Sequence, residues 1–132
     1  MITVYDVVKW LESDFDFEAN SYVSPLLSMK EEKVLCCQSG QSQSINPHPG
    51  VFDVLPVDLY IHWTTDADET EKKANEIYKK LYRKTNFIIN NEKICFLNMS
   101  LTHPKDMGKD GAGIYNRMIS FDLTIDTLKP KQ

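Results

Sequence analysis

Residues 57–81 read VDLYIHWTTDADETEKKANEIYKKL, and the change of pattern within this stretch decides the fold. From Val54 to Thr64, apolar residues stand at nearly every second position, which is typical of a strand with one buried face. The predicted buried residues are Val57, Leu59, Ile61 and Trp63, and the predicted outward ones are Asp58, Tyr60, His62 and Thr64. Because Pro56 has no N–H to donate, we expect the strand to start near this residue or to lie at an edge there.

The second half of the stretch predicts an amphipathic helix. Two N-terminal caps fit the sequence: Thr65 with Asp68, a capping box in which Asp replaces Glu, or Asp66 with Glu69. Acidic residues gather at the start of the helix and basic residues at its end, as the helix dipole prefers. Its predicted packing face carries Ala74, Ile77, Tyr78, Leu81 and Tyr82. Its other face carries charge pairs four residues apart, which are Glu69 with Lys73, Lys72 with Glu76, and Glu76 with Lys80.

Beyond the helix, the sequence predicts three strands. Residues 87–89 and 94–97 flank Asn90-Asn91-Glu92-Lys93, which indicates a tight hairpin because Asn tolerates left-handed backbone angles. The second of these strands is expected to continue to about Leu101, after which Pro104 and the glycine-rich residues 108–113 turn the chain. The final strand alternates almost perfectly, and its predicted buried face carries Ile119, Phe121, Leu123 and Ile125.

The first half of the chain has weaker patterns. A short helix is expected from Val4 to about Leu11, with Thr3 as its cap. Residues 14–18 alternate acids with aromatic rings, which predicts either an exposed strand or a loop pinned by its rings. A short strand is expected at residues 33–38. Residues 39–50 are small, polar and turn-forming, so we expect a mobile loop that is either a contact surface or a tolerated insertion.

These elements predict an α+β fold, in which a mixed, mainly antiparallel sheet is packed by one long and one shorter helix. The chain has 132 residues, and we expect one domain over residues 1–132 with a frayed tail at about 128–132. The net charge of −4 disfavours nonspecific binding to nucleic acid. No apolar run approaches the roughly 20 residues that span a bilayer, and the start is no signal peptide, so we expect a soluble protein made in the cytoplasm.

No pattern in the chain predicts catalysis, a cofactor or a metal. The three histidines, His48, His62 and His103, have no metal-ligand spacing, and His62 is interpreted as the outward residue of its strand. Residues 108–110 do not form a phosphate-binding loop, and the acids at 14 and 16 lack the rest of a calcium loop. The cysteines form no C-x-x-C pair and are interpreted as small apolar residues, although sequence alone leaves a Cys–His pair open.

Lys79, Lys80, Arg83 and Lys84 could form a nucleic-acid stripe, but their place at a helix end and the interleaved acids favour a solvated helix terminus.

Several motifs resemble one family of small structural proteins from long-tailed bacteriophages. They are LYIHWT at 59–64, ETEKKA at 69–74, IYKKL at 77–81 and PKDMGKDGAGIY at 104–115. The family members are called minor capsid proteins and are similar to tail terminators, which join tail to head. The resemblance covers roughly residues 57–125 and, more weakly, the opening residues 3–11. The chain departs from the family pattern at two places: the usual acidic pair after the glycine appears as Asp110-Gly111, and Asn116-Arg117 follows Tyr115 where an acid is common.

The resemblance implies a sheet flanked by helices that assembles as a ring of six subunits. The ring would cap the tail tube, end its growth and face the neck of the head. The alternative is another head–tail connector, namely a head-completion or stopper protein. The implied partners are further copies of the chain, the tail tube protein and a head–neck connector protein. DNA would pass through the ring without being read by sequence, and no membrane or cofactor is implied.

The implied location is the tail or neck of the virion, after assembly in the host cytoplasm. Polar loops are the expected docking surfaces, because they can order when a partner binds. The predicted interface residues are Gln41, Ser44 and His48 in the first loop and Met107, Lys109 and Asp110 in the second. No catalytic residue is predicted.

Overall fold

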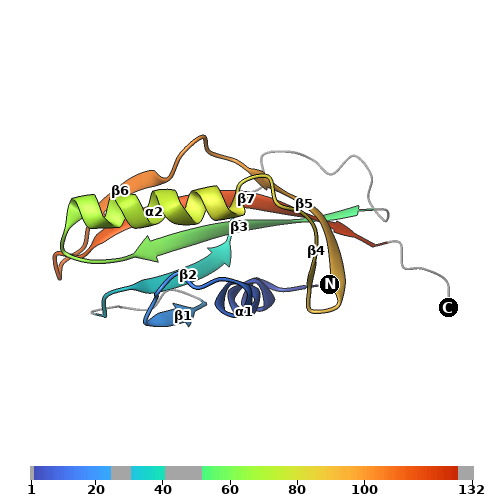
Figure 1. Cartoon of the computed structure of the whole chain (residues 1–132), viewed down its shortest axis with the longest axis horizontal. Helices are drawn as coiled ribbons and strands as arrows, with labels where there is room; N and C mark the ends of the chain where they lie inside the picture. Colours follow the sequence, from blue (N-terminus) through green and yellow to red (C-terminus); the bar gives the residue numbers. More distant parts are fainter. Residues whose placement is uncertain (1, 25–30, 41–51, 128–132) are drawn as a thin grey trace.

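The computed structural model describes residues 2–24, 31–40 and 52–127 (Figure 1). Residues 41–50 of the predicted loop at 39–50 and the predicted tail at 128–132 lie outside this part of the chain. The described elements are α1 (Val4–Asp14), β1 (Ser21–Val23), β2 (Val34–Ser39), β3 (Phe52–His62), α2 (Ala67–Leu81), β4 (Thr85–Ile89), β5 (Glu92–Met99), β6 (Lys105–Lys109) and β7 (Tyr115–Asp126).

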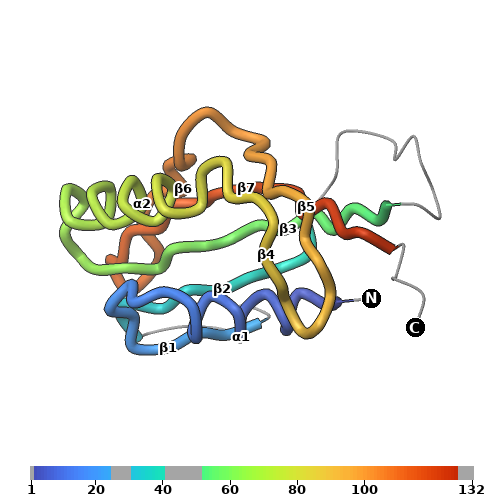
Figure 2. The backbone as a smooth tube through the Cα atoms, turned by 45° about the vertical axis from the view of Figure 1, so that its right-hand side comes forward, coloured from blue at the N-terminus to red at the C-terminus, as the bar shows by residue number. Residues whose placement is uncertain are grey.

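The strands form one curled sheet of order β1-β2-β3-β7-β5-β4, and β6 pairs with β7 beside this path. All pairings are antiparallel except that of β1 with β2. Figure 2 shows the β4–β5 hairpin folding over toward α1, which also lies along β1 and β2. The predicted α+β class, with its mainly antiparallel sheet and two helices of unequal length, is therefore confirmed.

The predicted alternation of β3 and β7 is confirmed in the centre of the sheet. Leu59 lies opposite Ile119 and both side chains are fully buried. The buried residues of both helices join these strand residues in one hydrophobic cluster. The described pairing of β3 with β2 ends at Val57, which lies opposite Ser39. Pro56, which has no N–H to donate, therefore interrupts none of the described pairs between these two strands. The β3 strand itself begins four residues earlier, at Phe52.

The α1 helix has the predicted cap. Thr3 Oγ1 accepts from the Asp6 amide at 3.3 Å, and Asp6 Oδ2 accepts from the Thr3 amide at 2.9 Å, which completes a capping box. The helix continues to Asp14, beyond the predicted end near Leu11. The residues that follow form a loop pinned by rings, because Phe15 packs edge-on against Trp10 and stacks on Phe17.

The α2 helix begins at the second of the two predicted caps. Asp66 is the N-cap, and its side chain accepts from the amides of Asp68 and Glu69, so the prediction of Thr65 as cap was wrong. The charge pairs also differ from those predicted: Lys72 pairs with Asp68 at 2.9 Å. Lys73 turns toward Glu76 and Glu18, both at 3.3 Å, and its Nζ lies over the Trp63 ring at 5.2 Å. Pairs along the helix are therefore present with other partners than predicted, and Lys73 adds a contact to Glu18 outside the helix.

Replacing Asp66 by alanine is expected to lower the free energy of unfolding by about 1 kcal/mol, because two amides at the helix start lose their acceptor. Asp66→Asn keeps an acceptor oxygen and should recover most of that loss. Urea unfolding followed by circular dichroism measures both variants. Equal stability of Asp66→Ala and the parent would show that this cap contributes nothing.

The predicted tight hairpin of β4 and β5 is confirmed, with Asn90 and Asn91 alone forming its turn. Asn90 and Asn91 have φ of 47° and 62°, the left-handed angles that the turn requires. Two strands were missed in the sequence, β1 and β6, and β5 ends at Met99 rather than near Leu101. The β6 strand has no buried residue, so it carries no apolar alternation that could have predicted it.

Candidate assembly interface

The β6 strand forms an exposed arm that we call the β6 arm (Lys105–Lys109). All five of its side chains are exposed, and the described residues pair it only with β7. Its pairing shifts register between Asp106 and Lys109, where Gly108 takes a φ of 76° that favours glycine. Met107 is 43% exposed at the middle of the arm. A strand that is paired on one side only can accept the backbone of another chain on its other side, so the arm is a candidate docking edge.

The chain turns from β6 into β7 through a segment that we call the corner (Asp110–Ile114). Asp110 organises it: the carboxylate Oδ1 accepts from the amides of Ala112 at 2.9 Å and Ile114 at 3.1 Å. The backbone adds two bonds, from the Asp110 amide to the Ile114 carbonyl and from the Gly113 amide to the Asp110 carbonyl, both at 3.0 Å. All four bonds involve Asp110, and its carboxylate accepts two of them.

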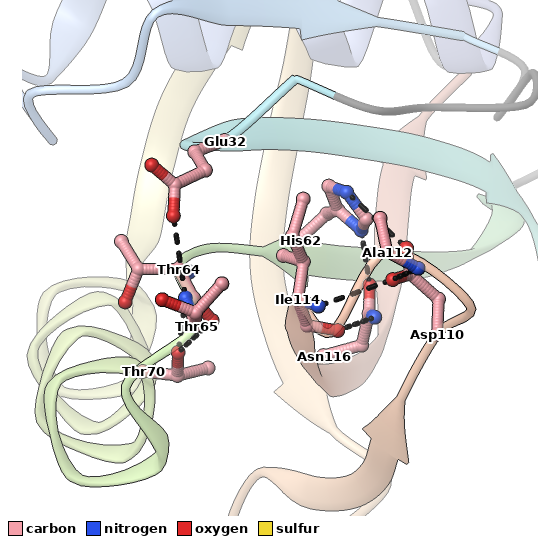
Figure 3. A network of polar contacts seen from close by, with 9 residues as sticks. All are labelled: Glu32, His62, Thr64, Thr65, Thr70, Asp110, Ala112, Ile114 and Asn116. Atoms are coloured by element: carbon pink, nitrogen blue, oxygen red, sulfur yellow. Dashed lines mark hydrogen bonds and ion pairs between the residues drawn. The ribbon is translucent and has the colours of Figure 1, made fainter.

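His62 lies beneath the corner and is 2% exposed, so the prediction that it points outward to solvent was wrong (Figure 3). Its residue position does lie on the outer face of β3, but the corner and the start of β7 cover that face here. His62 Nδ1 lies 2.8 Å from Asn116 Oδ1, and Nε2 lies 3.6 Å from Asp110 Oδ2. Strand alternation predicts the face of a residue, but not what later chain segments place over it.

Besides its backbone pairing with β7, the arm is linked to the rest of the protein through one arginine. The Arg117 guanidinium on β7 lies 3.6 Å from the Glu71 carboxylate on α2 and 3.8 Å from the Asp106 carboxylate on the arm. The backbones of β3 and β7 also meet here, since the Tyr115 amide donates to the Thr64 carbonyl at 2.9 Å. The arm therefore projects from a part of the fold that is well connected.

A second surface lies at the other end of α2. A groove of about 400 Å³ is bordered by Tyr78, Tyr82, Arg83 and residues 97–102. The Tyr78 hydroxyl donates to the Leu101 carbonyl at 2.7 Å, while Tyr82 stacks on Tyr78 and stays half-exposed. The prediction that Tyr82 packs against the sheet was therefore wrong, because the helix ends at Leu81 and Tyr82 has an extended backbone.

The structure brings together three of the six predicted interface residues, Met107, Lys109 and Asp110, on the arm and the corner. The other three, Gln41, Ser44 and His48, lie outside the described residues. The sequence did not predict that His62 and Asn116 contact each other beneath the corner. The motif around residue 62 was a signal that this position matters, although it did not indicate a contact with the corner.

The described residues contain no group of three or more His, Cys, Asp or Glu side chains that could hold a metal ion. Cys36 and Cys37 are buried in β2, and burial raises the pKa of the Cys36 thiol to about 11 and raises that of Cys37 further. Neither thiol is a nucleophile at neutral pH. Within the described ranges, no helix is long and apolar enough to cross a membrane.

Comparison of the sequence with models of protein families identifies the family of this chain. A family model described as bacteriophage tail terminator protein matches residues 29–127. The chain belongs to this tail terminator family. It is therefore a structural protein of a bacteriophage tail, and the tail terminator family is a family of structural proteins, not of enzymes. No curated protein and no solved structure shows significant similarity to the chain.

The match covers every described strand except β1 and the whole of α2, together with the β6 arm and the corner. Membership of the tail terminator family makes these exposed features candidates for contacts with other proteins of the virion.

Proposed function

We propose that this protein forms a ring that caps the phage tail tube, ends tail growth and joins the finished tail to the head. The family match is the single observation that carries the proposal. We propose further that residues 1–132 act as one domain, since both helices and the sheet share one hydrophobic cluster. The partners of the ring would be its own copies, the tail tube protein and a connector protein of the neck, with assembly in the host cytoplasm.

A ring requires two unlike patches on each subunit that fit each other and close after a fixed number of copies. The β6 arm and the groove beside Tyr82 are two such unlike surfaces. The arm offers an exposed strand with one apolar side chain, and the groove offers stacked aromatic rings beside Arg83. Aromatic residues and arginine contribute strongly to protein interfaces. The arm and the groove therefore support an assembly role.

Self-assembly can be tested on the purified protein. Light scattering over rising concentration should show a monomer passing to one closed ring, with six copies by family resemblance. Purified tails should shift this equilibrium toward the ring, because binding a partner stabilises the state that binds it. A protein that stays monomeric at all concentrations and does not bind tails would contradict the proposal.

The role in the virion can be tested by deleting the gene and imaging the particles. Loss of a terminator should give abnormally long tails that are detached from full heads. Loss of a head-completion or stopper protein would instead give heads that leak DNA, with tails of normal length. The second outcome would assign the chain to the neck and would overturn the tail-capping role.

A further inference from the structure

The protonation state of His62 is restricted by its two neighbours. The Asn116 side-chain amide donates from Nδ2 to the Ile114 carbonyl at 3.1 Å, which directs its Oδ1 at the His62 ring 2.8 Å away. An amide oxygen only accepts, so His62 Nδ1 must carry a proton to form this bond. A neutral His62 therefore has no hydrogen on Nε2, where most neutral histidines in water carry theirs.

The bare Nε2 is then in an unfavourable place. It is buried, has no hydrogen-bond partner among the described residues, and lies 3.6 Å from Asp110 Oδ2. A neutral Nε2 and an ionised carboxylate are both acceptors, so they repel each other and neither can satisfy the other. A proton on Nε2 turns this repulsion into an attraction, because the ring becomes a cation 3.6 Å from an anion.

The remaining surroundings of His62 do not compete for Asp110. From β2, Val34 lies opposite His62, and Cys36 lies opposite Tyr60 on the same face. From β7, the Arg117 guanidinium points to the carboxylates of Glu71 and Asp106 instead. Burial raises the pKa of Tyr60 and of Cys36, so both stay uncharged at neutral pH. Asp110 is the one ion-pair partner that the described residues give His62.

We propose that His62 and Asp110 form a protonation-dependent latch on the corner: the proton on Nε2 holds the Asp110 carboxylate, and its loss loosens the residues that this carboxylate organises. Histidine changes charge between about pH 5 and pH 8. The latch is closed while the His62 ring is a cation beside the Asp110 carboxylate. It opens when the proton on Nε2 leaves. The inference concerns the fold itself and holds whatever the arm binds.

Hydrogen exchange of two amides measures the latch directly. The amides of Ala112 and Ile114 both donate to Asp110 Oδ1. After correction for intrinsic exchange, their protection should fall roughly tenfold when the His62 ring loses its proton, because the Asp110 carboxylate then loses its ion-pair partner. The amides of Trp63 and Tyr115 bond to backbone carbonyls at the same place and should keep their protection.

Matched variants separate the latch from general effects of pH. In His62→Gln the pH dependence of Ala112 and Ile114 should disappear, because glutamine does not titrate. His103 contacts Thr102 in an exposed loop, so His103→Gln should leave the pH dependence as in the parent. Identical pH profiles in the parent and in His62→Gln would overturn the proposal.

A second measurement needs no variant, in case His62→Gln fails to fold. Nitrogen NMR shifts of the His62 ring should show the Nδ1–H tautomer at pH 8, and both nitrogens protonated at pH 5. A neutral ring with its proton on Nε2 would also overturn the latch, because that nitrogen would then already donate to Asp110.

Discussion

Leu81→Asp is expected to leave the protein unfolded at room temperature, with a loss of more than about 4 kcal/mol in the free energy of unfolding. Leu81 closes the last turn of α2, and its side chain is fully buried in the common hydrophobic cluster with Ala74 and Ile77. The substitution removes a large apolar side chain, which alone costs about 2–5 kcal/mol. It also places a carboxylate inside the hydrophobic cluster, away from water.

Ile88→Asp makes the same kind of change on an exposed side chain and serves as the control. Ile88 is 64% exposed on the edge strand β4, so its replacement should change stability by less than about 1 kcal/mol. Circular dichroism during heating compares both variants with the parent. If Leu81→Asp stayed soluble with the melting temperature of the parent, the placement of α2 on the sheet would be wrong.

Met107→Asp is expected to give the largest loss of assembly without a loss of fold. All side chains of the β6 arm are exposed, so the melting temperature should change little. If the arm is an interface with Met107 as its apolar anchor, the variant should bind its partner about 30-fold more weakly, the effect of a hot spot worth about 2 kcal/mol. The yield of joined virions from a complemented deletion strain measures this effect.

The control for assembly is again Ile88→Asp, which puts the same charge on an exposed apolar residue away from the arm. Lys109→Glu on the arm gives an independent second reading by reversing a charge. Asp110→Ala is less suitable, because the carboxylate of Asp110 also organises the corner and faces His62. Normal virion yields with both arm variants would remove the arm from the interface.

The sequence predicted those parts of the fold that are determined by the pattern of neighbouring side chains. The alternation of β3 and β7, the spacing of α2 and the Asn-Asn turn each follow from side chains near in sequence. The β1 and β6 strands were missed for a physical reason. They have no buried alternation of their own and exist as strands because β2 and β7 offer backbone partners.

The candidate site shows the same division. Met107 and Lys109 were predicted from a polar, glycine-rich loop, and the structure does place them on an exposed arm. His62 was misjudged because its burial depends on the corner, about 50 residues later in the chain. The roles of Asp66 and Tyr82 depend on where α2 begins and ends, and helix ends are where sequence patterns are least definite.

The paired cysteines of β2 have a consequence for a particle that must survive outside a cell. A virion leaves the reducing interior of its host and meets oxygen, which attacks thiols through their ionised form. Cys36 and Cys37 are shielded from water and resist ionisation, so they should remain reduced and unlinked in air. The β2 strand therefore keeps two small packing side chains that we expect to stay unoxidised in the virion.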